Sequence, residues 1–242
     1  MSAARELQGR SAVVTGGTRG IGLAIARALA QAGARVVVTG RDTSAAPTAV
    51  EGVQFVQADQ GADADWPRVM AAVGDLPGRF DILVLNAGVS PFSPIVATTL
   101  PAFRDVMRTN LKGAFLGLKH GVAAMRGHGQ GGAIAMVSSI VGKIGVAGVP
   151  AYAASKGGVR LMAKAAALEL GPEKIRVNSV HPGLIRTRMT EGYDEAAMGP
   201  RAPLGRFGDP EEITSGVQFL VSDRGRFVTG TELVVDGGWI VQ

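Results

Sequence analysis

Short apolar runs alternate with longer amphipathic stretches along this chain. The short runs are rich in β-branched residues, and some are apolar at every position, as at 36–38 (Val-Val-Val) and 82–85 (Ile-Leu-Val-Leu). Such runs are typical of strands that helices cover on both faces. Strands are predicted at 11–15, 35–39, 53–58, 82–86, 133–138, 176–180 and 232–235. Helices are predicted between them, at about 21–32, 64–73, 100–125, 152–170 and 210–220.

The regular alternation of strand and helix predicts the fold class. We expect an α/β fold of the Rossmann type, a doubly wound sheet of seven parallel strands with helices on both faces. Asp209, followed by Pro210 and two glutamates, marks the start of the last helix, because these residues suit an N-cap and a first turn. No repeat or Pro/Gly/Ser-rich linker divides the chain, so residues 1–242 are expected to form a single domain.

Composition narrows the function classes. Apolar residues make up 46% of the chain and charged residues 19%, which is typical of a folded core rather than of disorder. The sequence has no cysteine, so disulfides, thiolate nucleophiles and cysteine metal sites are excluded. His120, His128 and His181 lack the spacing of zinc ligands, so we expect each to be a surface or packing histidine and expect no metal site.

Charge and hydropathy indicate a small-molecule partner. The net charge of +5 is scattered, without a basic run, so neither a nucleic acid nor another polyanion is implied as partner. No stretch is long and apolar enough for a membrane span, and the first ten residues carry charges of both signs without the apolar core of a secretory signal. A cytoplasmic location is expected.

A glycine-rich turn joins the first predicted strand to the first helix. It reads TGGTRGIG over 15–22. Glycines permit a sharp turn and let a pyrophosphate approach the helix N-terminus. Such turns also occur for packing alone, but the position directly after the first strand favours a dinucleotide site. The turn residues expected at the cofactor are Gly16, Thr18, Arg19, Gly20, Ile21 and Gly22.

A candidate proton-transfer pair lies at the start of the helix predicted at 152–170. Tyr152 and Lys156 are four residues apart, which places them on one helix face. A nearby ammonium lowers the pKa of a tyrosine hydroxyl by favouring the phenolate, although an ordinary amphipathic helix would give the same spacing. Ser139 follows the strand at 133–138, at the carboxyl edge where α/β proteins bind ligands, and Ser138 is the competing serine.

Taken together, the TGxxxGxG turn and the YxxxK pair resemble the short-chain dehydrogenase/reductase family, in its single-domain subfamily. The resemblance extends from Gly9 to Gly238. It implies that Ser139, rather than Ser138, holds the substrate carbonyl, and that Asn110 supports a water that relays protons to Lys156. The implied catalytic tetrad is Asn110, Ser139, Tyr152 and Lys156.

The resemblance also implies cofactor contacts elsewhere. The family's NAG motif beside the nicotinamide ribose matches 86–88, the aspartate against the adenine matches Asp59, and the segment that holds the carboxamide matches 182–187. Leu85 stands where the family often has another asparagine, a tolerable change on an apolar strand. The residues implied at the cofactor, besides the glycine turn, are Asp59, Asn86, Gly88, Tyr152, Lys156, Pro182, Gly183, Ile185 and Thr187.

The end of the second strand predicts the kind of nicotinamide cofactor. NAD binding uses an acidic residue there to accept the ribose hydroxyls, but this chain has Gly40 followed by Arg41. Arg41 and Arg19 could hold the 2′-phosphate of NADP from both sides. NADPH is therefore predicted to be preferred to NADH. Asp42 is a competing feature, because it could neutralise Arg41 or turn it away.

We therefore expect an NADP(H)-dependent oxidoreductase, a carbonyl reductase or alcohol dehydrogenase, that transfers a hydride between the cofactor and a hydrophobic ketone or secondary alcohol. Reduction of a 3-oxoacyl group on acyl carrier protein is the alternative, and a non-catalytic NADP(H)-binding regulator is a third interpretation. The residues expected to line the substrate pocket are mostly apolar: Ser90, Phe92, Ile140, Val146, Leu184, Met189, Tyr193 and Met198.

Two further expectations concern motion and assembly. Residues 187–207 show no clear pattern between a strand and a helix, and we expect them to close over substrate as a lid. The helices at 100–125 and 152–170 carry more small and apolar residues than one sheet face needs. With the family resemblance, this predicts a homotetramer, with residues 239–242 near a contact.

Overall fold

The computed structural model describes residues 6–45 and 50–241 and contains one sheet of seven parallel strands. In spatial order these are β3 (Val53–Gln57), β2 (Arg35–Gly40), β1 (Arg10–Thr15), β4 (Arg79–Leu85), β5 (Gly132–Val137), β6 (Ile175–Pro182) and β7 (Glu232–Val235). The order reverses between β1 and β4, and such a switch point opens a crevice at the carboxyl ends of the strands. The predicted doubly wound fold is confirmed.

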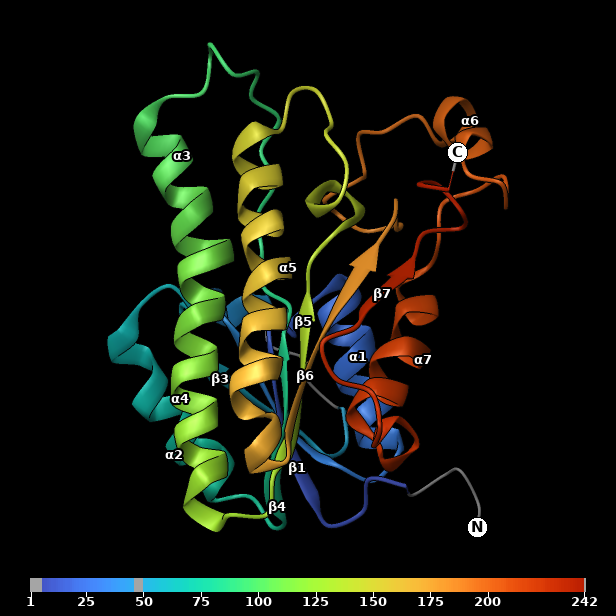
Figure 1. Ribbon diagram of the computed structural model, residues 1–242. Coiled ribbons are helices and arrows are strands. Elements are labelled where there is room, and N and C mark those ends of the chain that lie inside the picture. Colours follow the sequence, from blue (N-terminus) through green and yellow to red (C-terminus); the bar gives the residue numbers. More distant parts are fainter. Residues whose placement is uncertain (1–5, 46–49, 242) are drawn as a thin grey trace.

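Helices cover both faces of this sheet (Figure 1). One face carries α1 (Gly20–Gln31) and α7 (Pro210–Val221), and the other carries α2 (Trp66–Gly74), α4 (Gly113–His128) and α5 (Pro150–Leu170). β4 shows why its sequence is continuously apolar. Ile82 and Val84 pack under α1 and α7, whereas Leu83 and Leu85 pack under the opposite helices. Successive side chains of the strand thus enter different cores.

The predicted helix at 100–125 is interrupted. It consists of α3 (Leu100–Met107), a π-helical turn (Arg108–Lys112) and α4, whose C-cap Gly129 is in the left-handed region with φ of 65°. A π turn inserts one residue into the helical repeat, so an apolar pattern still reads as continuous across it. Asn110 lies in this turn and is buried. The sequence pattern thus predicts the helical stretch but not the π turn that holds a candidate catalytic residue.

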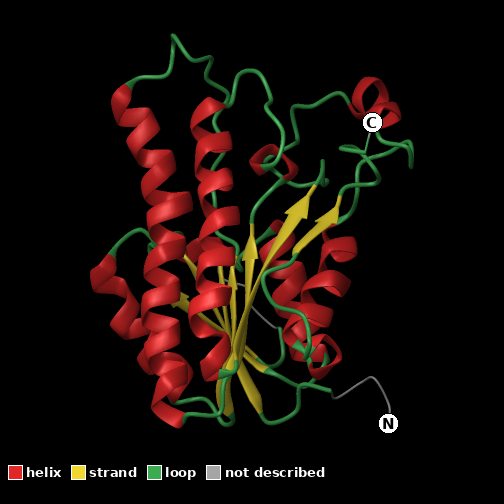
Figure 2. Ribbon diagram, in the orientation of Figure 1, coloured by secondary structure: helices red, strands yellow, loops and turns green. Residues whose placement is uncertain are grey.

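Residues 187–207 leave the sheet edge above the carboxyl end of β6 (Figure 2). The two ends of this segment are joined, because Ile185 pairs with Gly208 in an isolated bridge. Inside it lie the short α6 (Glu195–Met198), which the sequence pattern did not predict, and a 3-10 turn at Gly199–Arg201. Asp194 caps α6 by accepting from the Ala197 N–H at 3.2 Å. Across the described part of the chain, every helix is too short or too polar to cross a membrane.

Candidate active site

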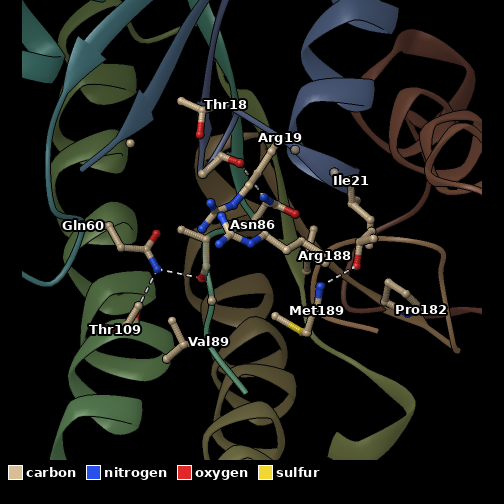
Figure 3. Close-up of a pocket in the computed structure, with 18 of the residues that line it drawn as sticks. Thr18, Arg19, Ile21, Gln60, Asn86, Val89, Thr109, Pro182, Arg188 and Met189 are labelled. Carbon is tan, nitrogen blue, oxygen red and sulfur yellow. Dashed lines mark hydrogen bonds between the residues drawn. The ribbon is translucent and has the colours of Figure 1, made fainter. Parts of the chain in front are cut away.

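A cavity of about 680 Å³ lies at the carboxyl ends of the central strands. Figure 3 shows part of its wall, with the glycine turn and α1 on one side and the start of the 187–207 segment on another. Every residue that the sequence predicts at the cofactor lines this cavity, and so do Ser139, Tyr152 and Lys156. Asn110 lies behind the wall, beside Thr109, which does line it.

The glycine turn brings the N-terminus of α1 to the cavity. Gly16 and Gly20 have φ of 65° and 53°, a conformation that favours glycine. A Cβ at Gly16 would lie 2.9 Å from the Cα of Ala87, so the turn packs directly on the end of β4. Asn86 fixes this contact by donating from Nδ2 to the Thr15 carbonyl at 3.0 Å.

The first turn of α1 suits a phosphate. Arg19 makes no side-chain cap to the helix, and the first turn contains no acidic residue. In α7, by contrast, a capping box of Asp209 and Glu212 occupies the same positions. The N–H groups and the positive dipole end of α1 therefore face the cavity without a side-chain partner. The residues present fit the diphosphate of a dinucleotide.

Asn110 is held by hydrogen bonds that join three elements. Its Oδ1 accepts from the Val89 N–H at 2.8 Å, and its Nδ2 donates to the Val89 carbonyl at 2.9 Å and to Ser155 Oγ at 3.0 Å. Ser155 in turn donates to the Tyr152 carbonyl at 2.7 Å. The π turn thereby connects the loop after β4 to the first turns of α5. This network orients the helix that carries Tyr152 and Lys156.

Burial sets the pKa values of the tyrosine and the lysine. It raises the pKa of Tyr152 to about 12, with a smaller opposing effect of the hydrogen bond to Ser139, and it lowers the pKa of Lys156 to about 8. The expected lowering of the tyrosine pKa by the ammonium is therefore wrong for the protein alone. Lys156 Nζ donates to the Val137 carbonyl at 2.8 Å and lies 5.7 Å from the Tyr152 ring centroid. Desolvation is the largest cause of the pKa shift of both groups.

The two candidate serines differ in direction. Ser139 Oγ accepts from the Val141 N–H at 3.1 Å, at the start of the 3-10 turn Ile140–Gly142, and interacts with Tyr152. Ser138 Oγ donates to the Lys156 carbonyl at 2.9 Å. Ser139 is thus the serine beside the tyrosine hydroxyl, whereas Ser138 fastens the turn to α5.

His181 supports the backbone of the same turn. It is fully buried, with Nδ1 3.0 Å from the Ser139 carbonyl oxygen and Nε2 2.9 Å from Ser179 Oγ. A carbonyl can only accept, so Nδ1 carries the proton and Nε2 accepts from the hydroxyl. Burial lowers the pKa of His181, which favours this neutral form. The expected packing histidine thus holds the backbone of Ser139 in place.

The adenosine end of the cavity contains charges of both signs. Gly40 and Arg41 line the wall near Arg19, and Asp42 accepts from the Ser44 N–H at 2.9 Å and from its hydroxyl at 2.6 Å. Those hydrogen bonds lower the pKa of Asp42. Among the described residues, Asp42 makes no ion pair with Arg41.

Asp59 lines the cavity together with several residues that sequence reasoning missed, Gln60 and Arg188 among them. Burial opposes ionisation of Asp59, but the hydrogen bond from Arg108 Nη1 at 2.7 Å lowers its pKa overall. Gln60 donates from Nε2 to the carbonyls of Ala87 and Thr109 at 2.8 and 2.7 Å (Figure 3). Arg188 was also missed. Gln60 directly follows Asp59, and Arg188 directly follows Thr187. This adjacency to a predicted cofactor residue is the sequence signal that could have identified both.

Only two of the predicted substrate residues line a cavity, in contrast to the predicted cofactor residues. Met189 lines the main cavity, and Tyr193 lines a second one beneath the 187–207 segment. Repulsion between the ionised forms of Tyr193 and Tyr152 is a minor cause of the raised pKa of Tyr152, so the two hydroxyls lie in one neighbourhood. The others form no part of either wall; Ile140 is buried and Phe92 is 73% exposed. Those outside both walls are Ser90, Phe92, Ile140, Val146, Leu184 and Met198.

The remaining histidines have structural partners. His120 stacks on Trp66 with ring centroids 5.9 Å apart, and its Nε2 lies 2.7 Å from Asp63 Oδ1. His128 Nε2 lies 2.9 Å from the Phe80 carbonyl. Within the ranges that the structure covers, no three His or carboxylate side chains gather in a way that could hold a metal ion.

Fold and site together define a dinucleotide-binding α/β protein with a serine, a tyrosine and a lysine at one cavity. Residues 16–240 match a family model described as enoyl-(acyl carrier protein) reductase. The chain is 39% identical to an NADP-dependent (R)-specific alcohol dehydrogenase of Lentilactobacillus kefiri, over 98% of each chain. It is 38% identical to a cyclopentanol dehydrogenase of Comamonas testosteroni, over 94% of this chain and 95% of the other.

A solved structure agrees with these relatives. A short-chain type dehydrogenase/reductase from Mycobacterium marinum superposes with a TM-score of 0.91 at 34% identity, covering 98% of this chain and 97% of that one. The chain belongs to the short-chain dehydrogenase/reductase family, as its motifs predicted, and it is an oxidoreductase of that family.

Proposed function

We propose that this protein is an NADP(H)-dependent oxidoreductase that interconverts a hydrophobic ketone and a secondary alcohol within a single domain. The observation that carries the proposal is the position of Ser139, Tyr152 and Lys156 on the wall of the cavity that fits a dinucleotide. The printed activities of the similar proteins, an NADP-dependent alcohol dehydrogenase and a cyclopentanol dehydrogenase, support the same reaction class.

The catalytic roles follow from the chemistry of these side chains. When bound, the nicotinamide supplies or accepts the hydride. The Ser139 hydroxyl holds the substrate oxygen, and the Tyr152 hydroxyl gives that oxygen a proton in reduction and takes it back in oxidation. With a pKa of about 12, the Tyr152 hydroxyl is protonated at neutral pH, as the reductive direction requires. The Lys156 ammonium, which donates to the Val137 carbonyl, would bind the nicotinamide ribose.

The same proposal assigns the cofactor contacts. The diphosphate would bind at the first turn of α1, and Pro182, Gly183, Ile185 and Thr187 would hold the carboxamide. Arg41 and Arg19 would hold the 2′-phosphate, where Gly40 offers no repelling carboxylate. Because Asp42 is bonded to Ser44, it leaves Arg41 available. Charge-assisted hydrogen bonds to a phosphate imply a preference for NADPH of about tenfold or more.

The preference is tested by the ratio of kcat/KM for NADPH and NADH. Gly40→Asp should move that ratio toward NADH. A Cβ at position 40 would lie 2.7 Å from Thr18 Cγ2, so Gly40→Ala is the control for the added volume and should affect both cofactors alike. Equal use of the two cofactors by the wild type would contradict the proposal, as would a shift that Gly40→Ala reproduces.

The substrate class is tested by a panel of ketones and alcohols, followed by absorbance of the reduced nicotinamide. Apolar cyclic and aryl ketones should be the best substrates. A 3-oxoacyl thioester should be poor, and faster turnover of that thioester than of any free ketone would favour the acyl carrier protein alternative. Cofactor binding without turnover of any compound would instead favour a regulatory role.

We further infer that residues 187–207 act as a lid. The support is local: the segment is fastened at Ile185 and Gly208, and it carries Tyr193 close enough to Tyr152 to affect the pKa of its hydroxyl. Closing over the substrate would exclude water from hydride transfer. A cytoplasmic location belongs to the same proposal, because the reaction needs a supply of reduced cofactor, and cell fractionation tests it.

A homotetramer is the assembly that we propose. Its support is the apolar outer surface of α4 and α5, which lie next to each other in Figure 1. Phe115 on α4 and Leu161 and Leu168 on α5 are exposed by 53%, 59% and 83%. Exposed apolar side chains on adjacent helices are typical of a subunit interface. The contact expected near residues 239–242 involves residue 242, which lies outside the described residues.

A further inference from the structure

Two arginines flank Thr187, and their surroundings differ. Arg186 donates to both Glu195 carboxylate oxygens at 2.9 and 2.5 Å and to Asp209 Oδ1 at 2.7 Å. Arg188 is exposed, and among residues 6–45 and 50–241 no carboxylate pairs with it. Figure 3 shows Arg188 reaching into the cavity. One arginine fixes the segment to the protein, and the other keeps its charge available.

The backbone around Arg188 is held against the phosphate end of the cavity. A Cβ at Gly20, the first residue of α1, would lie 3.3 Å from Thr187 Cγ2. The Thr187 N–H donates to Thr190 Oγ1 at 3.1 Å, and the Met189 N–H donates to Thr187 Oγ1 at 3.3 Å. These bonds form a tight turn from which the Arg188 side chain extends. The residue before Arg188 thus lies directly against the N-terminus of α1.

The location of Arg188 distinguishes it from the arginines at the adenosine end. Arg41 follows β2, whereas Arg188 lines both the main cavity and the second cavity, whose wall includes Tyr193. Arg188 therefore lies between the main cavity, which the first turn of α1 lines, and the second cavity, which the 187–207 segment lines. A guanidinium there can bind a phosphate through two parallel hydrogen bonds, and the diphosphate is the anion expected at that helix terminus.

We propose that Arg188 binds the cofactor diphosphate and thereby fastens the 187–207 segment over the substrate site. The proposal rests on the proposed function only for the presence of a dinucleotide diphosphate, which NAD and NADP share. The cofactor would supply the counter-charge that Arg188 lacks within the described chain. Cofactor binding would then order the segment before the substrate enters, because Arg188 belongs to the segment itself.

Binding of three probes to Arg188→Gln, measured by calorimetry, tests the first half of the proposal. NADP⁺ and 2′-phospho-ADP-ribose both contain the diphosphate, and their Kd should rise about tenfold. Adenosine 2′,5′-bisphosphate has no diphosphate, and its Kd should change less than about twofold. Arg188→Lys keeps the charge but cannot form two parallel hydrogen bonds to a phosphate. Its Kd for the diphosphate probes should lie between those of the wild type and Arg188→Gln. Arg27→Gln, on the exposed face of α1, controls for net charge.

Hydrogen exchange tests the second half. NADP⁺ should slow exchange of the 189–207 amides in the wild type, and this protection should be largely lost in Arg188→Gln at saturating cofactor. Unchanged Kd values, or equal losses for the bisphosphate and the two diphosphate probes, would overturn the assignment. Full protection in the variant would overturn the fastening role.

Failure of the cofactor proposal is distinguishable from failure of this one. NAD⁺ and ADP-ribose carry the diphosphate without the 2′-phosphate, so Arg188→Gln should weaken them by the same factor as NADP⁺. If the wild type showed no NADP preference while this factor persisted, the Arg188 assignment would stand and the 2′-phosphate assignment would fall.

Discussion

At the scale of single residues, the candidate chemistry depends on how Tyr152 and Lys156 are buried. Four-residue spacing predicts that they share a helix face, and the structure brings both to the cavity wall. Spacing does not give the degree of burial, which raises the pKa of one and lowers that of the other. The identity of the pair was therefore available from sequence, but the sign of the tyrosine shift was not.

Tyr152→Phe should lose at least about a hundredfold in kcat, because the change removes the hydroxyl that transfers the proton and general acid catalysis contributes about that much. The ring and its contact with Lys156 remain, so the Kd for NADP⁺ should stay within about twofold. Steady-state kinetics with a ketone substrate and a separate binding titration measure the two effects. Near-normal turnover would refute the assignment of the proton donor.

The serine pair gives a matched comparison. Ser139→Ala should be impaired about as strongly as Tyr152→Phe, since it removes the hydroxyl beside the tyrosine. Ser138→Ala removes a hydrogen bond to the Lys156 carbonyl and should mainly lower stability, by about 1 kcal/mol. The measurements are kcat and urea unfolding of both variants. The assignment would be reversed if Ser138→Ala lost more turnover than Ser139→Ala.

At the scale of elements, hydrophobic periodicity located every strand of the sheet within a few residues. It did not locate the π turn, because one inserted residue hardly disturbs an apolar pattern over a long helix. It also missed α6, a helix of four residues that is held by the Asp194 cap and by the ion pair between Glu195 and Arg186. Features shorter than about two helical turns leave too few periods to read.

One carboxylate of low exposure joins three elements and predicts a pH dependence. Glu232 on β7 is 12% exposed and forms an ion pair with Lys143, from the turn after Ser139. It also forms ion pairs with two residues of α5, Lys164 at 2.6 Å and Arg160 at 3.4 Å. Burial opposes its ionisation, but Lys143, Lys164 and Arg160 lower its pKa to about 2. The charged form is thus stabilised by folding.

Because the folded pKa lies below the unfolded value of about 4.3, this contribution is complete above that value and is lost as the pH falls toward 2. The wild type should lose about 1 kcal/mol of unfolding free energy from this group between pH 6 and pH 3.5. Urea unfolding of Glu232→Gln should show that loss reduced, and Glu211→Gln, exposed on α7, should behave like the wild type. Identical pH profiles for all three proteins would disprove the assignment.

At the scale of the whole molecule, the sequence predicted the architecture because parallel strands and glycine turns obey strict local rules. It did not predict which of the proposed substrate residues would line a cavity. Apolar character and loop position predict Phe92 and Val146 at the pocket, yet these residues are exposed by 73% and 42% and line neither cavity. Pockets built from loops depend on three-dimensional contacts that no period encodes.

Assembly is also a property of this scale. The wild type should sediment as a tetramer at micromolar concentration. Leu168→Glu combined with Phe115→Glu should shift it to smaller species, because two carboxylates per subunit would be buried at the interface. Val96→Glu, on an exposed loop before α3, should leave the tetramer intact. A wild-type monomer under these conditions would rule the proposal out.

The bridge between Ile185 and Gly208 has a consequence for how such a protein can change. The Arg186 N–H donates to the Gly208 carbonyl at 2.8 Å, and the Gly208 N–H donates to the Leu184 carbonyl at 2.9 Å. The chain between these points is therefore a closed loop, and doubling the length of a flexible loop costs only about 0.6 kcal/mol in closure entropy. Insertions and deletions inside it would leave the sheet untouched. The length of the loop beyond Arg188 can thus vary without moving the strands that carry the glycine turn and the residues around Ser139.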